Sequence, residues 1–498
     1  MPNIMKDEIF TDYKYNLELF NRINKLIYSN EYFLEHFFYK DYNLWHSYQA
    51  QIFERIKLFS NNISYNKTNT SILKIINSFC IGLFSSIISI IAFLIIILNR
   101  RKVLVYSIDK TSSKYKSDFR IEEIYNTLIN NKVGFLEIFH TLLDKNFILN
   151  FFARRRFAIY IESMDFIFSL LYKLNFIRIH NTTIINDLNF NNFKENEIKF
   201  IRNLFLEYLI KFELSKFRIK LLSLFLRFTN IKILLSIDDV RHYNDLILAC
   251  KINNIETYAF QHGHYTKYHV GWLSCTIKNY KIITPDKLIV WSDYWKNELI
   301  RLGTYFDKAQ IIVGGYKDII DVNIKNRRKT SQVNILMCYV KDAPKVEIFK
   351  FIRRLLMFNN IRIYFKLRSD IDTNLQLNNY NIKDNFHERF ILINNINEII
   401  NEVDLVTGPL STLFYDMIMY HKPIAVLKIG AYYGEELVLN SLADEIDPDN
   451  KNIIDELIRI KNTPKKILEH RKQRLLGKKR TFLGKYIKNV LIKEELIK

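Results

Sequence analysis

Two histidines and two acids lie where short apolar segments of the sequence end. Residues 257–260 form an apolar run that stops at a Gln-His-Gly-His sequence containing His262. The apolar run of residues 232–236 ends close to Asp238 and Asp239. An imidazole can act as a base near neutral pH or bind phosphate when protonated, and a positioned carboxylate can also accept a proton. These residues could therefore activate a hydroxyl group for attack.

The elements that must position these groups are two strands and a helix. A helical stretch over about residues 244–251 separates the two apolar runs, so the order is strand, polar tip, helix, strand, polar tip. That order is typical of a parallel α/β sheet, and ligands of such sheets bind at the carboxyl ends of the strands. We therefore expect His262, Asp238 and Asp239 to face one crevice, as catalytic residues.

Each of these residues also has a purely structural interpretation. The acids could cap a helix or pair with Arg241, and His262 could be hydrogen-bonded within its own turn. His264 and His269 are better explained as loop residues. No carboxylate or cysteine stands at a matching spacing from the three histidines, so we predict no metal site.

A basic turn in the C-terminal half could bind a diphosphate. Lys366 and Arg368 follow the apolar run of residues 361–365, and arginine can hold a phosphate through its planar fork. A solvated basic turn is the alternative.

A strand-to-helix turn further along is a second candidate for phosphate binding. Ser411 and Thr412 follow a run that ends at Gly408, and a helix is expected to begin near residue 413. Free N–H groups at a helix start can bind phosphate together with the two hydroxyls, although plain helix capping would use the same residues. We expect Asp416, one turn into the helix, to be solvated or to face a ribose.

Composition limits the class of protein. The chain has 498 residues, 49% of them hydrophobic, and a formal net charge of +21, so it can form two or three domains with full cores. The charge suits nucleic acid, an anionic membrane or phosphorylated substrates, but we find no nucleic-acid-binding motif. No two of the four cysteines form a CxxC pair, which fits a reducing compartment.

One long apolar segment indicates contact with a membrane. Residues 75–98 carry no charge and are long enough to span a bilayer. Arg100, Arg101 and Lys102 follow at once, as in a cytoplasmic flank. A buried core helix is the alternative, and the sequence leaves open whether the segment crosses the membrane or only dips into it.

The remaining pattern predicts an α/β protein with two tandem Rossmann-like domains and an N-terminal helical, membrane-associated extension. The first α/β domain starts with a strand over residues 102–109, and a second strand is expected over residues 147–152. A polar, basic linker over residues 318–332 separates the two domains. The predicted divisions are residues 1–74 (helical accessory segment), 75–99 (membrane-associated helix), 100–320 and 330–460 (the α/β domains), and 461–498 (basic C-terminal helices).

Several motifs over about residues 230–430 occur in the same order as in a known family. QHG is followed by VWSDYWKNEL and VGGYKD, and a Ser-Thr turn is followed by an acid and a Lys-Pro pair: Ser411, Thr412, Asp416, Lys422 and Pro423. This order resembles the bacterial GT-B transferases of surface-polysaccharide assembly, near the capsule-polysaccharide and CDP-glycerol glycerophosphotransferase enzymes. The chain departs from them at the Lys-x-His-Pro turn that such enzymes often carry, where it has Lys366-Leu367-Arg368-Ser369.

The resemblance implies a metal-independent glycosyltransferase that transfers a sugar or polyol phosphate from a nucleotide-activated donor to a glycan or lipid-linked acceptor. The domain of residues 100–320 would bind the acceptor and supply the base. The domain of residues 330–460 would bind the donor, through Lys366, Arg368, Gly408, Ser411, Thr412 and Asp416. No cofactor and no nucleic-acid partner is expected, and the implied place is the cytoplasmic face of the bacterial inner membrane. A non-catalytic, membrane-associated GT-B-like scaffold is the alternative, while nucleic-acid binding has only the charge in its favour.

Overall fold

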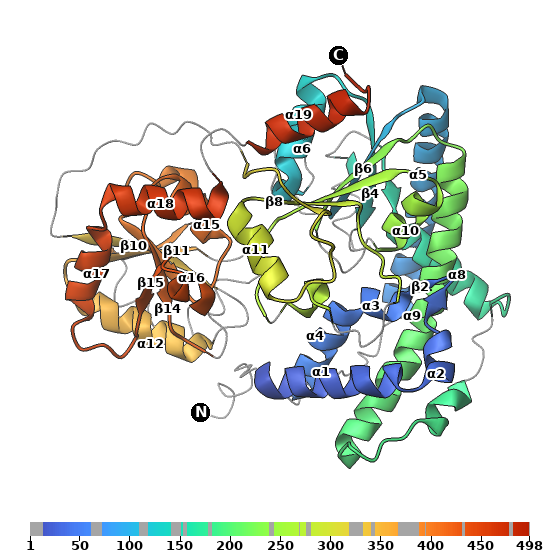
Figure 1. Ribbon diagram of the computed structural model, residues 1–498, viewed down its shortest axis with the longest axis horizontal. Helices are drawn as coiled ribbons and strands as arrows, with labels where there is room; N and C mark the ends of the chain where they lie inside the picture. The colour runs from blue at the N-terminus through green and yellow to red at the C-terminus, as the bar shows by residue number, and fades with distance from the viewer. Residues whose placement is uncertain are drawn as a thin grey trace. The chain divides into compact units, whose positions relative to one another are not determined.

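The computed structural model describes most of the chain in two compact units (Figure 1). The N-terminal unit comprises Asn16–Trp291, Trp295–Asp318 and Thr481–Lys498, and the C-terminal unit comprises Met1–Tyr15, Ser292–Tyr294 and Ile319–Arg480. The described residues are 13–60, 72–108, 118–140, 151–152, 157–177, 182–238, 244–267, 269–274, 280–317, 332–339, 344–366, 388–393, 395–430, 434–477 and 482–497.

The N-terminal unit is built on a seven-stranded sheet with the strand order β5-β4-β3-β6-β7-β8-β9. All neighbouring strands are parallel. The order reverses between β3 and β6, which makes the gap between their carboxyl ends the topological switch point. The strands are β3 (Val103–Ile108), β4 (Phe135–His140), β5 (Ile159–Tyr160), β6 (Ile233–Ile237), β7 (Glu256–Phe260), β8 (Lys287–Val290) and β9 (Ile311–Val313).

The C-terminal unit is built on a six-stranded sheet with the order β12-β11-β10-β13-β14-β15, again all parallel. Its switch point lies between β10 and β13. Counted within each unit, both sheets contain the strand order 3-2-1-4-5-6 of the Rossmann fold, so the prediction of two α/β units with parallel sheets is confirmed. The strands are β10 (Val333–Cys338), β11 (Ile361–Lys366), β12 (Phe390–Ile393), β13 (Leu405–Gly408), β14 (Ile424–Leu427) and β15 (Asp444–Ile446).

Helices flank both sheets. Those named in the N-terminal unit are α1 (Tyr13–Tyr28), α2 (Glu31–Glu35), α3 (Leu44–Ser47), α4 (Gln49–Ser60), α5 (Ile72–Asn99), α6 (Glu122–Asn130), α8 (Ile161–Lys173), α9 (Glu195–Arg227), α10 (Asn244–Ile252), α11 (Asp293–Arg301) and α19 (Leu483–Lys493). Those of the C-terminal unit are α12 (Lys345–Leu356), α15 (Leu413–Met419), α16 (Glu435–Leu439), α17 (Ile453–Lys461) and α18 (Lys465–Leu476). A short hairpin of β1 (Phe38–Tyr39) and β2 (Tyr42–Asn43) follows α2.

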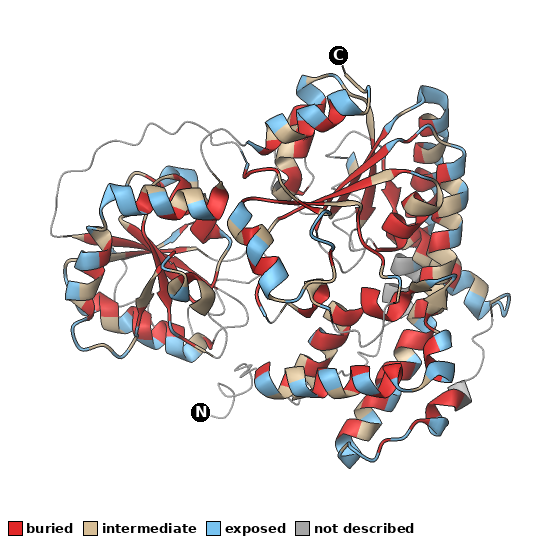
Figure 2. Ribbon diagram, viewed as in Figure 1, coloured by how far each residue is buried: buried red, intermediate tan, exposed pale blue. Residues whose placement is uncertain are grey.

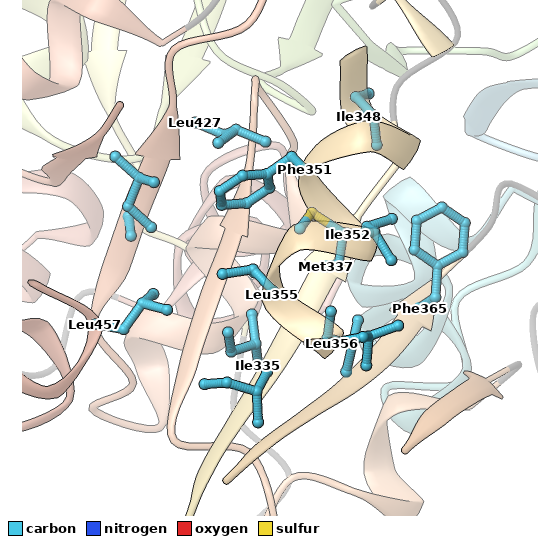
Figure 3. Packing of buried hydrophobic residues seen from close by; sticks show 14 of the residues in the cluster. Ile335, Met337, Ile348, Phe351, Ile352, Leu355, Leu356, Phe365, Leu427 and Leu457 are labelled. Atoms are coloured by element: carbon cyan, nitrogen blue, oxygen red, sulfur yellow. The ribbon is translucent and has the colours of Figure 1, made fainter. Parts of the chain in front are cut away.

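The strands are held in place by apolar cores on the sheet faces. In the C-terminal unit α12 packs its buried stripe, including Phe351 and Leu355, onto Ile335 and Met337 of β10 (Figure 3). Every residue of β10 is buried, as expected of a central strand covered on both faces. The carboxyl ends of the strands therefore have fixed positions, which is what a site at that edge requires.

Helices near the start and near the end of the described chain both contribute to the N-terminal unit. Residues of α19, including Ile487 and Leu491, share a core with Ile124 and Leu128 of α6. The N-terminal helices pack on α9 through aromatic rings; the ring centroids of Phe37 and Phe212, for example, are 4.5 Å apart. Described residues of 16–60 and the last helix are thus parts of this unit's core.

The apolar segment forms helix α5. Within the described residues, Phe79–Asn99 is the one stretch long and apolar enough to cross a membrane, and a third of that window is buried against the protein. A core helix can have the same length and composition, so membrane contact stays a prediction at this point.

Candidate functional site

The two strands that precede the candidate catalytic residues are neighbours in the sheet. Ile237, the last residue of β6, pairs with Phe260, the last residue of β7. The N–H of Asp238 donates to the Phe260 carbonyl at 3.0 Å, which extends the ladder by one residue. Asp238 and His262 therefore leave the same edge of the sheet side by side, and Asp238 lies at the switch point.

The carboxylate of Asp238 is a buried acceptor for three donors. Its Oδ1 contacts Nδ1 of the His262 ring and accepts the His262 backbone N–H at 3.2 Å. Its Oδ2 accepts the Tyr265 hydroxyl at 2.7 Å. Only 1% of Asp238 is exposed. A buried carboxylate is tolerated when its oxygens are hydrogen-bonded in this way.

These contacts assign different roles to the two residues. Nδ1 of His262 faces a carboxylate, so Nδ1 carries the proton in the neutral ring and the lone pair is on Nε2. The His262 side chain is 20% exposed, whereas both Asp238 oxygens are occupied inside the protein. The arrangement can make His262 a general base and Asp238 the residue that orients it. Asp239 and Arg241 lie outside the described residues.

The turn that carries His262 is fixed by Gln261. The side chain of Gln261 donates to the Gly263 carbonyl at 2.7 Å and accepts the Trp291 backbone N–H at 2.9 Å. The indole N–H of Trp291 in turn donates to the Gln261 carbonyl at 2.9 Å. The glutamine of the QHG motif thus anchors the turn to the end of the neighbouring strand β8.

Tyr265 is a site residue that the sequence interpretation missed. Its ring is buried and meets Trp272 and Trp295 in edge-to-face contacts, with centroids 5.4 and 6.1 Å away. This packing points its hydroxyl at Asp238. The available signal was a hydroxyl-bearing aromatic residue just after a histidine turn, but only the fold shows its partner.

Replacing Tyr265 by Phe should keep the ring packing. It should lower the rate of a reaction in which His262 acts as the base by about tenfold. The change leaves one oxygen of a buried carboxylate without its donor, which typically costs about 1–3 kcal/mol, so the melting temperature should also fall. Steady-state kinetics and thermal unfolding would measure both effects. Tyr305→Phe is the control, since its hydroxyl donates to the Gly271 carbonyl and not to Asp238. Turnover equal to that of the native protein would show that Asp238 needs no help from Tyr265.

The other two histidines of the loop lie close to each other. Burial, followed by the neighbouring His262, lowers the pKa of His264 to about 4, so its ring is neutral at physiological pH. The ring centroids of His264 and His269 are 5.7 Å apart, and the Thr266 hydroxyl contacts Nδ1 of His269 at 3.3 Å. Among the described residues, no group of three or more His, Cys, Asp and Glu side chains is placed to hold a metal ion.

At the second switch point the backbones of two strands come very close. A Cβ atom on Gly408, at the end of β13, would lie 2.5 Å from the carbonyl oxygen of Cys338 at the end of β10. Real Cβ atoms do not approach backbone this closely, so only glycine fits without a shift of the strands. Gly408 therefore sets the width of this switch point.

The turn after Gly408 is capped from within. The Ser411 hydroxyl accepts the Leu413 N–H at 3.2 Å. The next two N–H groups, of Phe414 and Tyr415, donate to the carbonyls of Ser411 and Thr412. These three amides are thus used by the turn itself, although the side chain of the N-cap residue Thr412 makes no capping hydrogen bond. A phosphate here would contact side chains rather than these amides.

A lysine and a thiol meet at this edge. Lys366, the last residue of β11, pairs in register with Cys338. Burial lowers the pKa of Lys366 and raises the pKa of the Cys338 thiol to about 12, so the thiol stays protonated and is not a nucleophile. The Ser411 hydroxyl lowers the pKa of this thiol and the charge of Asp416 raises it, both by less than burial does.

Four predicted donor-binding residues thus lie together around Cys338: Lys366, Gly408, Ser411 and Asp416. Thr412 follows them at the exposed start of α15. Arg368 lies outside the described residues. Lys422 belongs to the motif after α15. Its ammonium group donates to the Val403 carbonyl at 2.7 Å, which links the segment before β14 to the segment before β13.

No protein-family model matches the chain, and no curated protein sequence matches it. Among solved structures, the UDP-GlcNAc 2-epimerase of Neisseria meningitidis, bound to UDP-GlcNAc, is 12% identical, with a TM-score of 0.44 over 79% of this chain and 99% of that chain. S. aureus MnaA, solved with UDP, is 12% identical, with a TM-score of 0.45 over 80% and 97%. Anabaena HepE in complex with UDP is 9% identical, with a TM-score of 0.43 over 79% and 99%.

Proposed function

We propose that this protein is a GT-B-type glycosyltransferase. It transfers a sugar, or a polyol phosphate, from a nucleotide-activated donor to a hydroxyl group of a surface polysaccharide or lipid-linked glycan. The observation that carries the proposal is the Asp238–His262 pair at the switch point of the first sheet. A buried carboxylate that orients a partly exposed imidazole is an arrangement suited to removing a proton from a hydroxyl.

In the proposed reaction, Nε2 of His262 takes the proton of the acceptor hydroxyl while the oxygen of that hydroxyl attacks the donor. The bond to the leaving nucleotide phosphate breaks with its electron pair, and the proton stays on the imidazole. The Asp238 carboxylate stabilises the imidazolium that results. Asp239 is the other acid proposed for this edge.

The C-terminal unit would bind the donor at its own switch point. Lys366 provides a cation at the strand end, and Arg368 is proposed to share this role. The hydroxyls of Ser411 and Thr412 and the carboxylate of Asp416 would contact the rest of the nucleotide. The close approach of Gly408 to the Cys338 carbonyl requires a residue without a side chain at this strand end. We propose that these groups stabilise the leaving phosphate without a metal ion.

Turnover of nucleotide-activated donors is the direct test. Purified protein would be assayed for nucleotide release from UDP-, CMP-, GDP- and CDP-activated donors, with His262→Ala measured beside it. We expect the native protein to release nucleotide from donors of one nucleotide class. We expect the His262→Ala variant to lose this activity. Thermal unfolding with each nucleotide separates the alternatives, since a ligand at 100 times its Kd adds about 2.7 kcal/mol to stability. Absence of both turnover and protection would favour the non-catalytic scaffold.

Lys366→Ala should raise the KM for the donor by about 10- to 100-fold and leave the KM for the acceptor unchanged. The reason is that hydrogen bonds to charged groups contribute roughly 1.5–3 kcal/mol, and Lys366 is the described cation at the second switch point. Initial rates at varied donor and acceptor concentrations would measure both constants. Lys350→Ala, on the exposed side of α12, is the matched control. An unchanged donor KM would place the Lys366 ammonium outside the donor site.

A further inference from the structure

Helix α5 exposes a row of large apolar side chains along one side. Eight are exposed, Phe79 and Ile91 among them, and the other six fall on about one third of the helix circumference at 3.6 residues per turn: Leu83, Ile87, Ile90, Leu94, Ile97 and Leu98. We call these six residues the α5 stripe. Solvent-facing helix surfaces are normally polar, and a continuous exposed apolar surface of this kind marks a contact surface.

The opposite side of α5 packs on the protein and contains small and polar residues together with the buried Ile81, Ile88 and Ile96. The hydroxyl of Ser89 accepts the backbone N–H of Tyr160 in β5 at 3.0 Å. The ring of Phe166 in α8 lies directly against Gly82, where a Cβ would come within 2.5 Å of it. This helix is therefore docked along one side and is not available to be surrounded by lipid.

A second helix extends the apolar surface at the end of α5. The rings of Phe93 and Phe225 are 4.3 Å apart, which places the last turns of α5 and α9 side by side. Leu224 and Phe228 are both exposed there. Figure 1 shows α5 and α9 together on one side of the sheet, and Figure 2 marks exposed positions on both.

Cations follow both helix ends. Arg100 and Lys102, after α5, and Arg227, at the end of α9, are all exposed. Arg227 also lines an open cavity of about 450 Å³ together with Thr229, Asn253 and other residues. An apolar stripe that ends in cations and a polar hollow fits the chemistry of a bilayer with anionic headgroups. Self-association through this surface is disfavoured by the net charge of +21.

We propose that the α5 stripe inserts into one leaflet of an anionic phospholipid bilayer, with α5 lying in the membrane plane. The helix does not cross the bilayer, because only its exposed side faces lipid. Arg100, Lys102 and Arg227 contact headgroup phosphates at one end of the stripe. This inference is independent of the proposed catalytic activity, since it requires only the exposed surface of α5 and α9.

Co-sedimentation of the full chain with vesicles tests the proposal. Vesicles of phosphatidylcholine and phosphatidylglycerol in a 7:3 ratio would be compared with phosphatidylcholine alone. We expect binding to the anionic vesicles that weakens with added salt, and at least about tenfold weaker binding to the neutral ones. Failure to bind the anionic vesicles overturns the proposal.

Two sets of variants separate the apolar from the electrostatic contribution. Ile90→Asp with Leu94→Asp should weaken binding at least about tenfold, whereas Leu439→Asp should not, although Leu439 is 73% exposed in the C-terminal unit. Arg100→Glu with Lys102→Glu should remove the preference for phosphatidylglycerol, at about fivefold per cation. Native melting temperatures would show that the variants fold. Native binding by the stripe variant contradicts the proposal.

Alkaline carbonate extraction of membranes that contain the native chain distinguishes in-plane from spanning helices. A protein held by one side of a helix should be released by the wash, and retention in the pellet would show that α5 crosses the bilayer.

Analytical ultracentrifugation of native and stripe-variant protein tests whether a second copy of the chain covers the α5 stripe. A native dimer that the stripe variant converts to a monomer would assign the surface to a second copy instead.

Discussion

His262→Ala should lower turnover by about 10²- to 10⁴-fold, the contribution of a positioned general base, and leave the melting temperature nearly unchanged. The ring is partly exposed, and its removal does not leave Asp238 without donors. The backbone N–H of residue 262 still reaches Oδ1, and the Tyr265 hydroxyl still reaches Oδ2. Turnover with saturating donor and a thermal melt would show the two effects separately.

The matched control is a second histidine that pairs with a carboxylate away from the site. His421 contacts Glu469 at 2.6 Å, and its side chain is 27% exposed, close to the value for His262. Its backbone φ is +56°, which asparagine tolerates, so His421→Asn is the suitable change. The control should keep its turnover. If His262→Ala turns over within a few-fold of the native protein, His262 is not the base, and Asp238 or Asp239 becomes the leading candidate.

Much of the fold could be predicted because buried strands of a parallel sheet are continuous apolar runs. Strands β3, β6, β7 and β11 differ by one residue at one or both ends from the runs identified in the sequence at residues 102–109, 232–236, 257–260 and 361–365. The second strand was misplaced. It was expected over residues 147–152, whereas β4 lies at Phe135–His140; residues 147–150 are outside the described chain, and 151–152 are helical.

Strands with weak sequence signals were not found. Strand β5 has two residues, and β15 begins with Asp444 and Glu445. Short or polar edge strands are specified by their neighbours in the sheet and not by their own pattern. Neither strand lies at a switch point, so the omission did not affect the candidate sites.

The site itself was predictable as far as topology determines it. Residues that follow neighbouring parallel strands must meet at one edge, and this principle brought Asp238 and His262 together. It could not show which of the two is buried. That depends on contacts at the end of the sheet, such as the hydrogen bond from the Tyr265 hydroxyl to Asp238 and the one from the Trp291 backbone N–H to the Gln261 side chain. The contact of Cys338 with Gly408 was missed for the same reason, since the two residues approach each other only in the folded sheet.

A double-mutant comparison should show that Asp238 works only through His262. Asp238→Asn alone should lower turnover, though by less than the roughly 10²- to 10⁴-fold of His262→Ala. An asparagine can keep its oxygen toward the ring and turn its amide toward the Tyr265 hydroxyl, which can accept. The ring then keeps its tautomer but loses the negative charge that stabilises the imidazolium.

In the His262→Ala background, Asp238→Asn should therefore reduce turnover by no more than a few-fold, because there is no imidazolium left to stabilise. Groups that act as one unit show this non-additivity. If Asp238 were itself the base, the second substitution would remove a further factor of about 10² or more. Additive losses in the double variant would thus transfer the proton-accepting role to Asp238, whereas a single shared loss would leave it with Nε2 of His262.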